Sequence, residues 1–389
     1  MRVSPTSGLS VLVAAIVFFL PSEHMQAVPI DSNLVVNQAA FNQTLPAVVS
    51  DASGGAIMVW EDGRNGGSAD TNHDIYAQHV DNDGTLLWGT SGKAICTKPG
   101  SQGSPAVTSD GAGGAIIVWE DTRSGQYDLY AQRVNSAGSL RWAADGILIC
   151  SVESIKVFPE IVSDGAGGAI VLWQDLRNGS NFDLYAQRID STGTLRWASQ
   201  GVAVCTAANN QSSVDLVASS DGGIIAAWED YRALDITSDI YTQKVNKDGV
   251  VQWNGNGVRI SSSPGYELNP AIASDNFGGA YVVWEDRRSD PNGDLYAQRV
   301  LSNGTLAFDP SGVAMTTAAS SQVAPRAVSD GVDGVICVWN DYQSGNSDIY
   351  AQRLLSTGVI AWSENGVSVC SASGNQLFQI GRASCRERV

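Results

Sequence analysis

The sequence predicts an all-β fold, a β-propeller built from four-stranded blades. Two motifs carry this prediction, and each occurs six times. A tryptophan followed by Glu, Gln or Asn and then Asp recurs every 54 to 59 residues, and an Asp-Ile/Leu-Tyr-Ala/Thr-Gln motif follows each copy. A repeat of this length is one supersecondary unit whose copies bury a shared core, so the six units form one array. The tryptophans are Trp60, Trp119, Trp173, Trp228, Trp284 and Trp339.

The second unit shows the order of the expected strands. Residues 105–110 form a first strand, and residues 115–121 an apolar, β-branched second strand without a helical period. Residues 128–135 alternate as a third strand, and residues 140–150 make a broken fourth. Four strands in about 55 residues, without a helical stretch, predict a propeller blade. A parallel β-helix has shorter coils, and immunoglobulin-like modules need about 100 residues.

The number of blades has two readings. Residues 33–51 align with residues 146–164, so the array begins with a fourth-type strand that could complete the last blade. Residues 366–379 nevertheless give the sixth unit its own fourth strand and begin another unit. The sequence therefore predicts either a six-bladed ring or a truncated seven-bladed one.

The two ends of the sequence differ from the repeats. Residues 1–27 have the layout of a secretory signal peptide, and their apolar run at 9–20 is shorter than the ~20 residues of a transmembrane helix; a signal anchor is the alternative. Residues 380–389 break the repeat and match the translation of a common short-read sequencing adapter, so we expect an assembly artefact. The propeller is assigned to residues 28–379, and the mature protein is expected to be secreted: extracellular, at the cell surface or periplasmic.

Composition excludes some partners. The formal net charge is -17, which argues against nucleic acid and anionic membrane surfaces as partners. No second segment suits membrane insertion, and we expect a monomer. Five cysteines outside the tail are expected to be free, mostly buried thiols, because equivalent positions on different blades lie too far apart for disulfides. They are Cys96, Cys150, Cys205, Cys337 and Cys370.

The acidic and basic residues of the repeat predict a structural network. Asp121 and Arg123 are two residues apart, and Asp128 lies across the hairpin, so the three can tie the turn through charge-assisted hydrogen bonds. Trp119, Tyr130 and Trp142 are expected to pack between blades. The predicted network comprises Asp62, Arg64, Asp121, Arg123, Asp128, Asp175, Arg177, Asp230, Asp286 and Arg288, and it fails in the sixth unit, where Gln343 replaces the arginine.

Regular repetition argues against an active site. A catalytic centre needs one asymmetric set of groups, whereas six similar units give six similar environments. No catalytic residue and no cofactor are therefore predicted, and ligand contacts are expected on the varied loops. His73 beside Asp70 and Asp74 could bind a metal, although we expect a solvated loop histidine, and the acidic turn at residues 81–84 leaves a single calcium site open. The candidate ligand-binding residues are Asp70, His73, Tyr231, Arg232, Asp235, Arg287 and Asp290.

A third motif carries a resemblance. Glycine followed four residues later by tryptophan or phenylalanine recurs from Gly84 to Gly358 and resembles the Asp-box turns of sialidase-type propellers. The spacing is one residue longer, and aspartate precedes the glycine only at Asp83 and Asp248. The whole repeat, from about residue 33 to 379, is more similar to that of uncharacterised secreted bacterial propeller proteins. This resemblance implies fold and export; no sialidase catalytic residue can be placed on this sequence.

These observations favour a secreted, non-enzymatic binding or scaffold module that engages an extracellular glycan or protein. The alternative is a polysaccharide-active hydrolase or lyase of the sialidase-like propeller type. A third possibility is a structural spacer without a ligand.

Overall fold

The computed structural model describes residues 34–66, 72–233, 237–288 and 292–376. The whole expected signal peptide and the whole expected artefact thus lie outside the described residues. Within them, the chain is all β: 24 strands form six four-stranded antiparallel sheets, and there is no helix, hence none that could cross a membrane. The predicted fold class is confirmed.

Each sheet takes its strands in sequence order and forms one blade. Blade one contains β1 (Gln43–Ser50), β2 (Ala56–Asp62), β3 (Asp74–Val80) and β4 (Lys93–Cys96). Blade two contains β5 (Gln102–Ser109), β6 (Ala115–Asp121), β7 (Asp128–Val134) and β8 (Ile147–Leu148). Blade three contains β9 (Lys156–Ser163), β10 (Ala169–Asp175), β11 (Asp183–Ile189) and β12 (Val202–Cys205).

The second half repeats this plan. Blade four contains β13 (Gln211–Ala218), β14 (Ile224–Asp230), β15 (Asp239–Val245) and β16 (Val258–Arg259). Blade five contains β17 (Glu267–Ser274), β18 (Ala280–Asp286), β19 (Asp294–Val300) and β20 (Val313–Thr316). Blade six contains β21 (Gln322–Ser329), β22 (Val335–Asp341), β23 (Asp348–Leu354) and β24 (Val367–Cys370).

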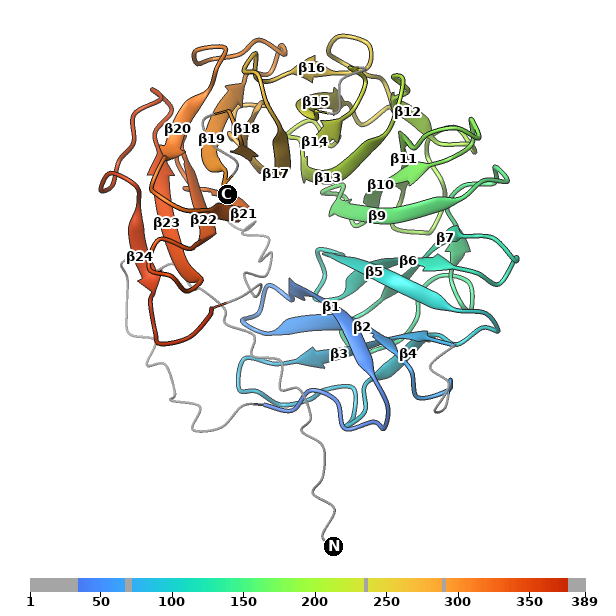
Figure 1. The fold of residues 1–389 in the computed structure, drawn as a ribbon. Coiled ribbons are helices and arrows are strands. Elements are labelled where there is room, and N and C mark those ends of the chain that lie inside the picture. Colours follow the sequence, from blue (N-terminus) through green and yellow to red (C-terminus); the bar gives the residue numbers. More distant parts are fainter. Residues whose placement is uncertain (1–33, 67–71, 234–236, 289–291, 377–389) are drawn as a thin grey trace, which may run out of the picture.

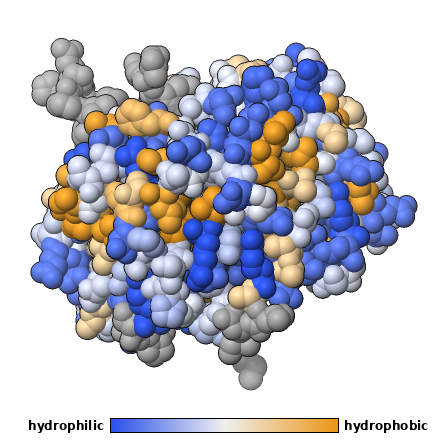
Figure 2. Space-filling model, turned by 90° about the horizontal axis from the view of Figure 1, so that it is seen from above, coloured by the Kyte–Doolittle hydropathy of each residue, from blue (hydrophilic) through white to orange (hydrophobic). Residues whose placement is uncertain are grey.

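The blades are arranged around a central axis, with the first strand of each blade innermost (Figure 1). Seen from above, hydrophobic residues form separate groups among hydrophilic ones (Figure 2). Because all blades share one strand order, the hairpins between second and third strands lie on the same face as the entries to the inner strands. The described residues that flank the varied loops of blades one, four and five belong to this face.

The core lies between neighbouring blades. Trp119 is fully buried and packs with Val49 and Ile57 of blade one, whereas Ile116 and Val118 of the same strand pack against blade three. Both faces of β6 are therefore covered, which explains its uninterrupted apolar sequence. Across the hairpin, Trp119 faces Tyr130 in the ladder, with ring centroids 6.5 Å apart.

The predicted turn network contains a bidentate ion pair. Arg123 Nε and Nη2 donate to the two carboxylate oxygens of Asp121, at 2.9 and 2.5 Å, and the Trp119 indole donates to the same carboxylate at 2.9 Å. The guanidinium lies 3.9 Å from the centroid of the Tyr130 ring. The same bidentate pairing occurs at Asp62/Arg64, Asp230/Arg232 and Asp286/Arg288. In the Asp175/Arg177 pair only Nη2 of the guanidinium donates to the carboxylate, and the buried Nε of Arg177 has no partner among the described residues.

The partners of Asp128 differ from the expected Asp-Arg-Asp cluster, in which it would contact Arg123. Although it faces Asp121 in the ladder, its carboxylate accepts hydrogen bonds from Ser124 Oγ at 2.7 Å and Lys156 Nζ at 2.9 Å. Arg123 is already hydrogen-bonded to both carboxylate oxygens of Asp121. The ion pair at this turn therefore consists of Asp121 and Arg123 alone.

A second ion pair closes the hairpin between the first two strands. Asp110 accepts backbone hydrogen bonds from Ala112 and Gly114, and Arg133 binds its other oxygen at 3.0 Å. In blade one the cation is replaced by His79, whose Nε2 lies 2.8 Å from Asp51. Equivalent pairs are Arg188–Asp164, Arg299–Asp275 and Arg353–Asp330.

The five cysteines are free, but they differ in exposure. Four are buried, and burial raises the pKa of Cys96 to about 11. Cys370 is exposed, unlike the buried Cys96, Cys150 and Cys205 at the same repeat position. The expectation of mostly buried thiols holds except at the outer strand of blade six.

Candidate functional site

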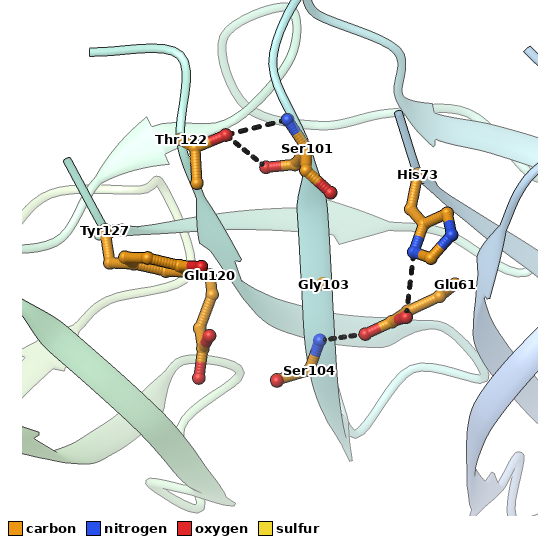
Figure 3. A pocket seen from close by; sticks show the side chains of 8 residues that line it. All are labelled: Glu61, His73, Ser101, Gly103, Ser104, Glu120, Thr122 and Tyr127. Carbon is orange, nitrogen blue, oxygen red and sulfur yellow. Dashed lines mark hydrogen bonds and ion pairs between the residues drawn. The ribbon is translucent and has the colours of Figure 1, made fainter. Parts of the chain in front are cut away.

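A cavity of about 200 Å³ lies between blades one and two, on the face that carries the varied hairpins. Its walls come from both blades, with the start of β5 between them (Figure 3). Eight residues line it: Glu61, His73, Ser101, Gly103, Ser104, Glu120, Thr122 and Tyr127.

Glu61 links the two blades at this point. One carboxylate oxygen accepts the backbone N–H of Ser104 at 2.6 Å. The other lies 3.2 Å from both the Thr44 hydroxyl and His73 Nδ1. Ser104 has a φ of +48°, at a bulge where β5 leaves its register with β6. Glu61 thus caps a backbone group that the bulge leaves without a ladder partner.

The glutamate contact is a repeated feature. Glu120 accepts the N–H of Phe158 at 2.7 Å, Glu229 that of Asn269 at 2.7 Å, and Glu285 that of Ala324 at 2.8 Å. Burial raises the pKa of Glu120, against the hydrogen bond from Phe158. The Glu of each Trp-Glu-Asp motif therefore holds the next blade, and this role alone does not create a binding site.

The cavity exists because blade two has a glycine where the other blades have a side chain. The positions equivalent to Gly103 hold Thr44, Val157, Ser212, Leu268 and Val323. A Cβ at Gly103 would lie 2.8 Å from Glu61 Oε1, so even a methyl group would enter the space beside the carboxylate. Glycine therefore leaves space beside the Glu61 carboxylate.

His73 and Tyr127 occupy equivalent positions, each directly before a third strand, and both face the cavity. Tyr127 is 47% exposed and offers an aromatic face. Thr122 accepts the N–H of Ser101 at 2.7 Å and donates to its carbonyl at 3.1 Å (Figure 3). The lining thus has acidic, hydroxyl, imidazole and aromatic groups, and neither lysine nor arginine.

The structure separates the candidate residues of the sequence. His73 belongs to the cavity, whereas Tyr231 lies in blade four, where its hydroxyl donates to Glu229 at 3.0 Å. Arg232 pairs with both oxygens of Asp230, so its side chain belongs to the repeat network. Arg287 is exposed beside Gly293 in blade five. Asp70, Asp235 and Asp290 lie outside the described residues.

The described residues contain no group of three or more His, Cys, Asp and Glu side chains that could hold a metal ion. In the acidic turn at 81–84, Asp81 accepts the backbone N–H groups of Asp83 and Thr85, so this carboxylate closes the turn.

Sequence reasoning missed Gly103, Glu61, Glu120 and Tyr127. The signal was present as a break in the repeat, since Gly103 is the one glycine among six equivalent positions. The significance of this glycine could be recognised only from the packing of the blades, which places it beside Glu61 of the preceding blade.

Comparisons with known proteins identify similar folds. No protein-family model and no curated protein matches the chain. Among solved structures, a protein of unknown function from Dyadobacter fermentans DSM 18053 is 11% identical, with a TM-score of 0.46 over 82% of this chain and 96% of that chain. The GH93 alpha-L-arabinofuranosidase of Fusarium graminearum is 11% identical, with a TM-score of 0.47 over 83% and 97%.

The endo-arabinase from Bacteroides thetaiotaomicron VPI-5482 is 12% identical, with a TM-score of 0.38 over 72% of this chain and 99% of that chain. At these identities and TM-scores, the similarities assign no activity to this chain.

Proposed function

We propose that this protein is a secreted, non-enzymatic propeller that binds a neutral saccharide in the cavity between blades one and two. The observation that carries the proposal is the glycine at position 103, where the five equivalent positions carry a side chain; it borders a polar cavity beside an exposed tyrosine. Export rests on the signal-peptide layout of residues 1–27.

The lining suits the hydroxyl groups of a sugar. Carboxylates accept hydrogen bonds from sugar hydroxyls, and protein hydroxyls both donate and accept them. An exposed aromatic ring offers an apolar face for the C–H groups of a sugar ring. Two carboxylates, no lysine or arginine in the lining and a net charge of -17 disfavour an anionic ligand. A neutral saccharide matches this chemistry better than a sialylated or sulfated one.

The size of the cavity limits what enters it. Pockets for small-molecule ligands usually have ~300–1,000 Å³, and this cavity has about 200 Å³. We therefore expect one sugar residue to enter, with the rest of a longer chain lying across the hairpins of blades one and two.

A polysaccharide hydrolase is the second candidate, because Glu61 and Glu120 line the same cavity and burial raises the pKa of Glu120. A raised pKa is what a general acid needs near neutral pH. Against this role, both carboxylates hold backbone N–H groups of the next blade, as Glu229 and Glu285 do at other blade boundaries. Repetition therefore favours binding over catalysis.

An array of neutral, sialylated and sulfated glycans tests the proposal. We expect binding to neutral glycans, and loss of that binding in both His73→Ala and Tyr127→Ala. Tyr231→Ala, which changes the contact of the equivalent glutamate in blade four, serves as the control and retains binding. Selective binding of anionic glycans, or binding unchanged in both cavity variants, would overturn the proposal. Turnover of a bound oligosaccharide that disappears in Glu120→Gln would favour the hydrolase.

A further inference from the structure

Five of the six outer strands are covered by the following blade, and the sixth is not. The residue before each cysteine position is buried in blades one to five: Ile95, Ile149, Val204, Ile260 and Met315 are at most 2% exposed. The equivalent Val369 of blade six is 47% exposed. Cys370 beside it is exposed as well. Blade six therefore presents an apolar strand that every other blade buries.

The tryptophan of the Gly-x-x-x-Trp motif shows the same difference. Its indole N–H donates to a carbonyl of the next blade at 3.0 to 3.2 Å: Trp88 to Ser136, Trp142 to Ser191, Trp197 to Lys247 and Trp253 to Ser302. In the described residues, the indole of Trp362 in blade six has no such acceptor. The amide nitrogen of Asn340, at the position of the capping glutamates, is buried there without a partner.

Blade one is open on the opposite side. At the start of its inner strand, Pro46 is exposed and Gln43 half-buried, whereas the equivalent Pro105 and Gln102 of blade two are buried against blade one. Leu45 is 57% exposed. In Figure 1 the red strands of blade six and the blue strands of blade one are more widely separated than neighbouring blades elsewhere.

The segment after β24 makes the same hydrogen bonds as the segments that precede the inner strands of the other blades. The N–H of Gln376 donates to the Ser347 carbonyl at 2.7 Å, as the N–H of Gln102 does to His73 at 2.8 Å. The Gln376 amide donates to Ala372 and Gly374, as that of Gln102 does to the loop before β5. Gln376 is therefore placed as the first residue of another inner strand.

Residues 34–38 occupy the place of an outer strand in front of blade one. The N–H of Gln38 donates to Thr90 at 3.3 Å, as the N–H of Ser151 does to the equivalent Ser199 at 3.4 Å. Asn37, at the cysteine position, donates to Asp62 of the turn network. The segment makes the contacts of a fourth strand toward the following blade, yet it pairs with no third strand in the described residues.

We propose that the interval between blades six and one is the seat of a seventh blade of the same repeat. Its first three strands follow Gln376 in the same polypeptide, and residues 34–37 are its fourth strand, which closes the ring. The blade would supply a carbonyl to Trp362, cover Val369 and Cys370, and bury the exposed start of β1. This inference is independent of the saccharide site, which lies between blades one and two.

The test compares the 389-residue chain with two extended chains. In these, residues 377–389 are replaced by a copy of residues 103–145 of blade two or 157–199 of blade three. Alkylation of Cys370 and Cys96 is followed by peptide mass spectrometry, oligomeric state by light scattering, and amide exchange of residues 34–38 by hydrogen–deuterium exchange. A scrambled copy of the blade-two extension is the control.

We expect the 389-residue chain to be monomeric, with Cys370 alkylated as fast as in urea and Cys96 protected. An extension should slow Cys370 alkylation by roughly tenfold or more, as burial in a stable interface does, and should slow exchange at residues 34–38. The scrambled copy should do neither. The proposal is overturned if neither extension protects Cys370 while Cys96 stays protected. Protection of Cys370 already in the 389-residue monomer would indicate a closed six-bladed ring, and would overturn the proposal. Protection of Cys370 that appears only on dimerisation would indicate that a second copy of the chain covers this strand, and would overturn it as well.

Discussion

The carboxylate of Glu61 accepts the backbone N–H of Ser104 at 2.6 Å, across the boundary between blades one and two. The same contact joins Glu285 to Ala324 at 2.8 Å between blades five and six, where the residue equivalent to Gly103 is Val323 and not glycine. A hydrogen bond from a backbone N–H to the glutamate of the preceding blade thus joins neighbouring blades at several boundaries. At the boundary between blades one and two, this glutamate also lines the cavity.

Replacing either glutamate should therefore destabilise the protein, but only one replacement should change binding. Glu61→Ala and Glu285→Ala each leave a backbone N–H without its acceptor, at a cost of about 1–3 kcal/mol. We expect similar losses in the free energy of unfolding in urea. Binding of a neutral saccharide should fall only in Glu61→Ala; an equal fall in Glu285→Ala would place the ligand elsewhere.

Glu267 should make stability depend on pH. Burial, with Asp286 and Asp239 nearby, raises the pKa of Glu267 to about 7, against hydrogen bonds from Ser261 and from the N–H of Ile240. The folded state then holds the proton more tightly than the unfolded chain, whose pKa is about 4.5. Stability is therefore full below about pH 4.5 and falls as the pH rises to about 7, by about 3 kcal/mol.

Glu267→Gln removes this ionisation and places there the residue that blades two, four and six carry as Gln102, Gln211 and Gln322. We expect the variant to unfold at a higher urea concentration than the wild type at pH 8, and the two to converge toward pH 4.5. Parallel pH profiles of the two proteins would contradict this assignment.

Gly146 should be required for the packing of Trp119. It has a φ of +90°, and a Cβ there would lie 2.6 Å from the tryptophan ring. Gly125 has nearly the same φ, +89°, with no atom within 4 Å of its Cβ position. Gly146→Ala should therefore be less stable than Gly125→Ala by roughly 1–3 kcal/mol, the usual cost of overpacking. Equal midpoints in thermal unfolding would show that backbone strain alone matters at both sites.

The sequence was sufficient to predict the blades, because each second strand carries its own apolar run and each hairpin its own turn residues. Trp119 opposite Tyr130 follows from that pattern. The partner of Asp128 could not be predicted, because Lys156 comes from the next blade. The ion pair of Arg133 with Asp110 was missed for a related reason: it spans two hairpins of one blade, and only the ladder register brings the residues together.

The site was harder to predict than the fold, because its residues look like repeat residues. Glu61 and Glu120 belong to the commonest motif in the chain, and only the missing side chain at Gly103 leaves space beside the Glu61 carboxylate. His73 was found because histidine is rare in this sequence. Tyr127 was not, although it holds the equivalent position one blade later.

The most direct test of the saccharide site is a calorimetric titration of Gly103→Val with a neutral oligosaccharide selected on the array. Valine is the residue that blades three and six carry at this register, as Val157 and Val323, so the fold accommodates it while the cavity is filled. Ser212→Val places valine at the same register in blade four and serves as the control. We predict that Gly103→Val remains folded but loses binding, and that Ser212→Val binds as the wild type does. Undiminished binding by a folded Gly103→Val would contradict the proposed site.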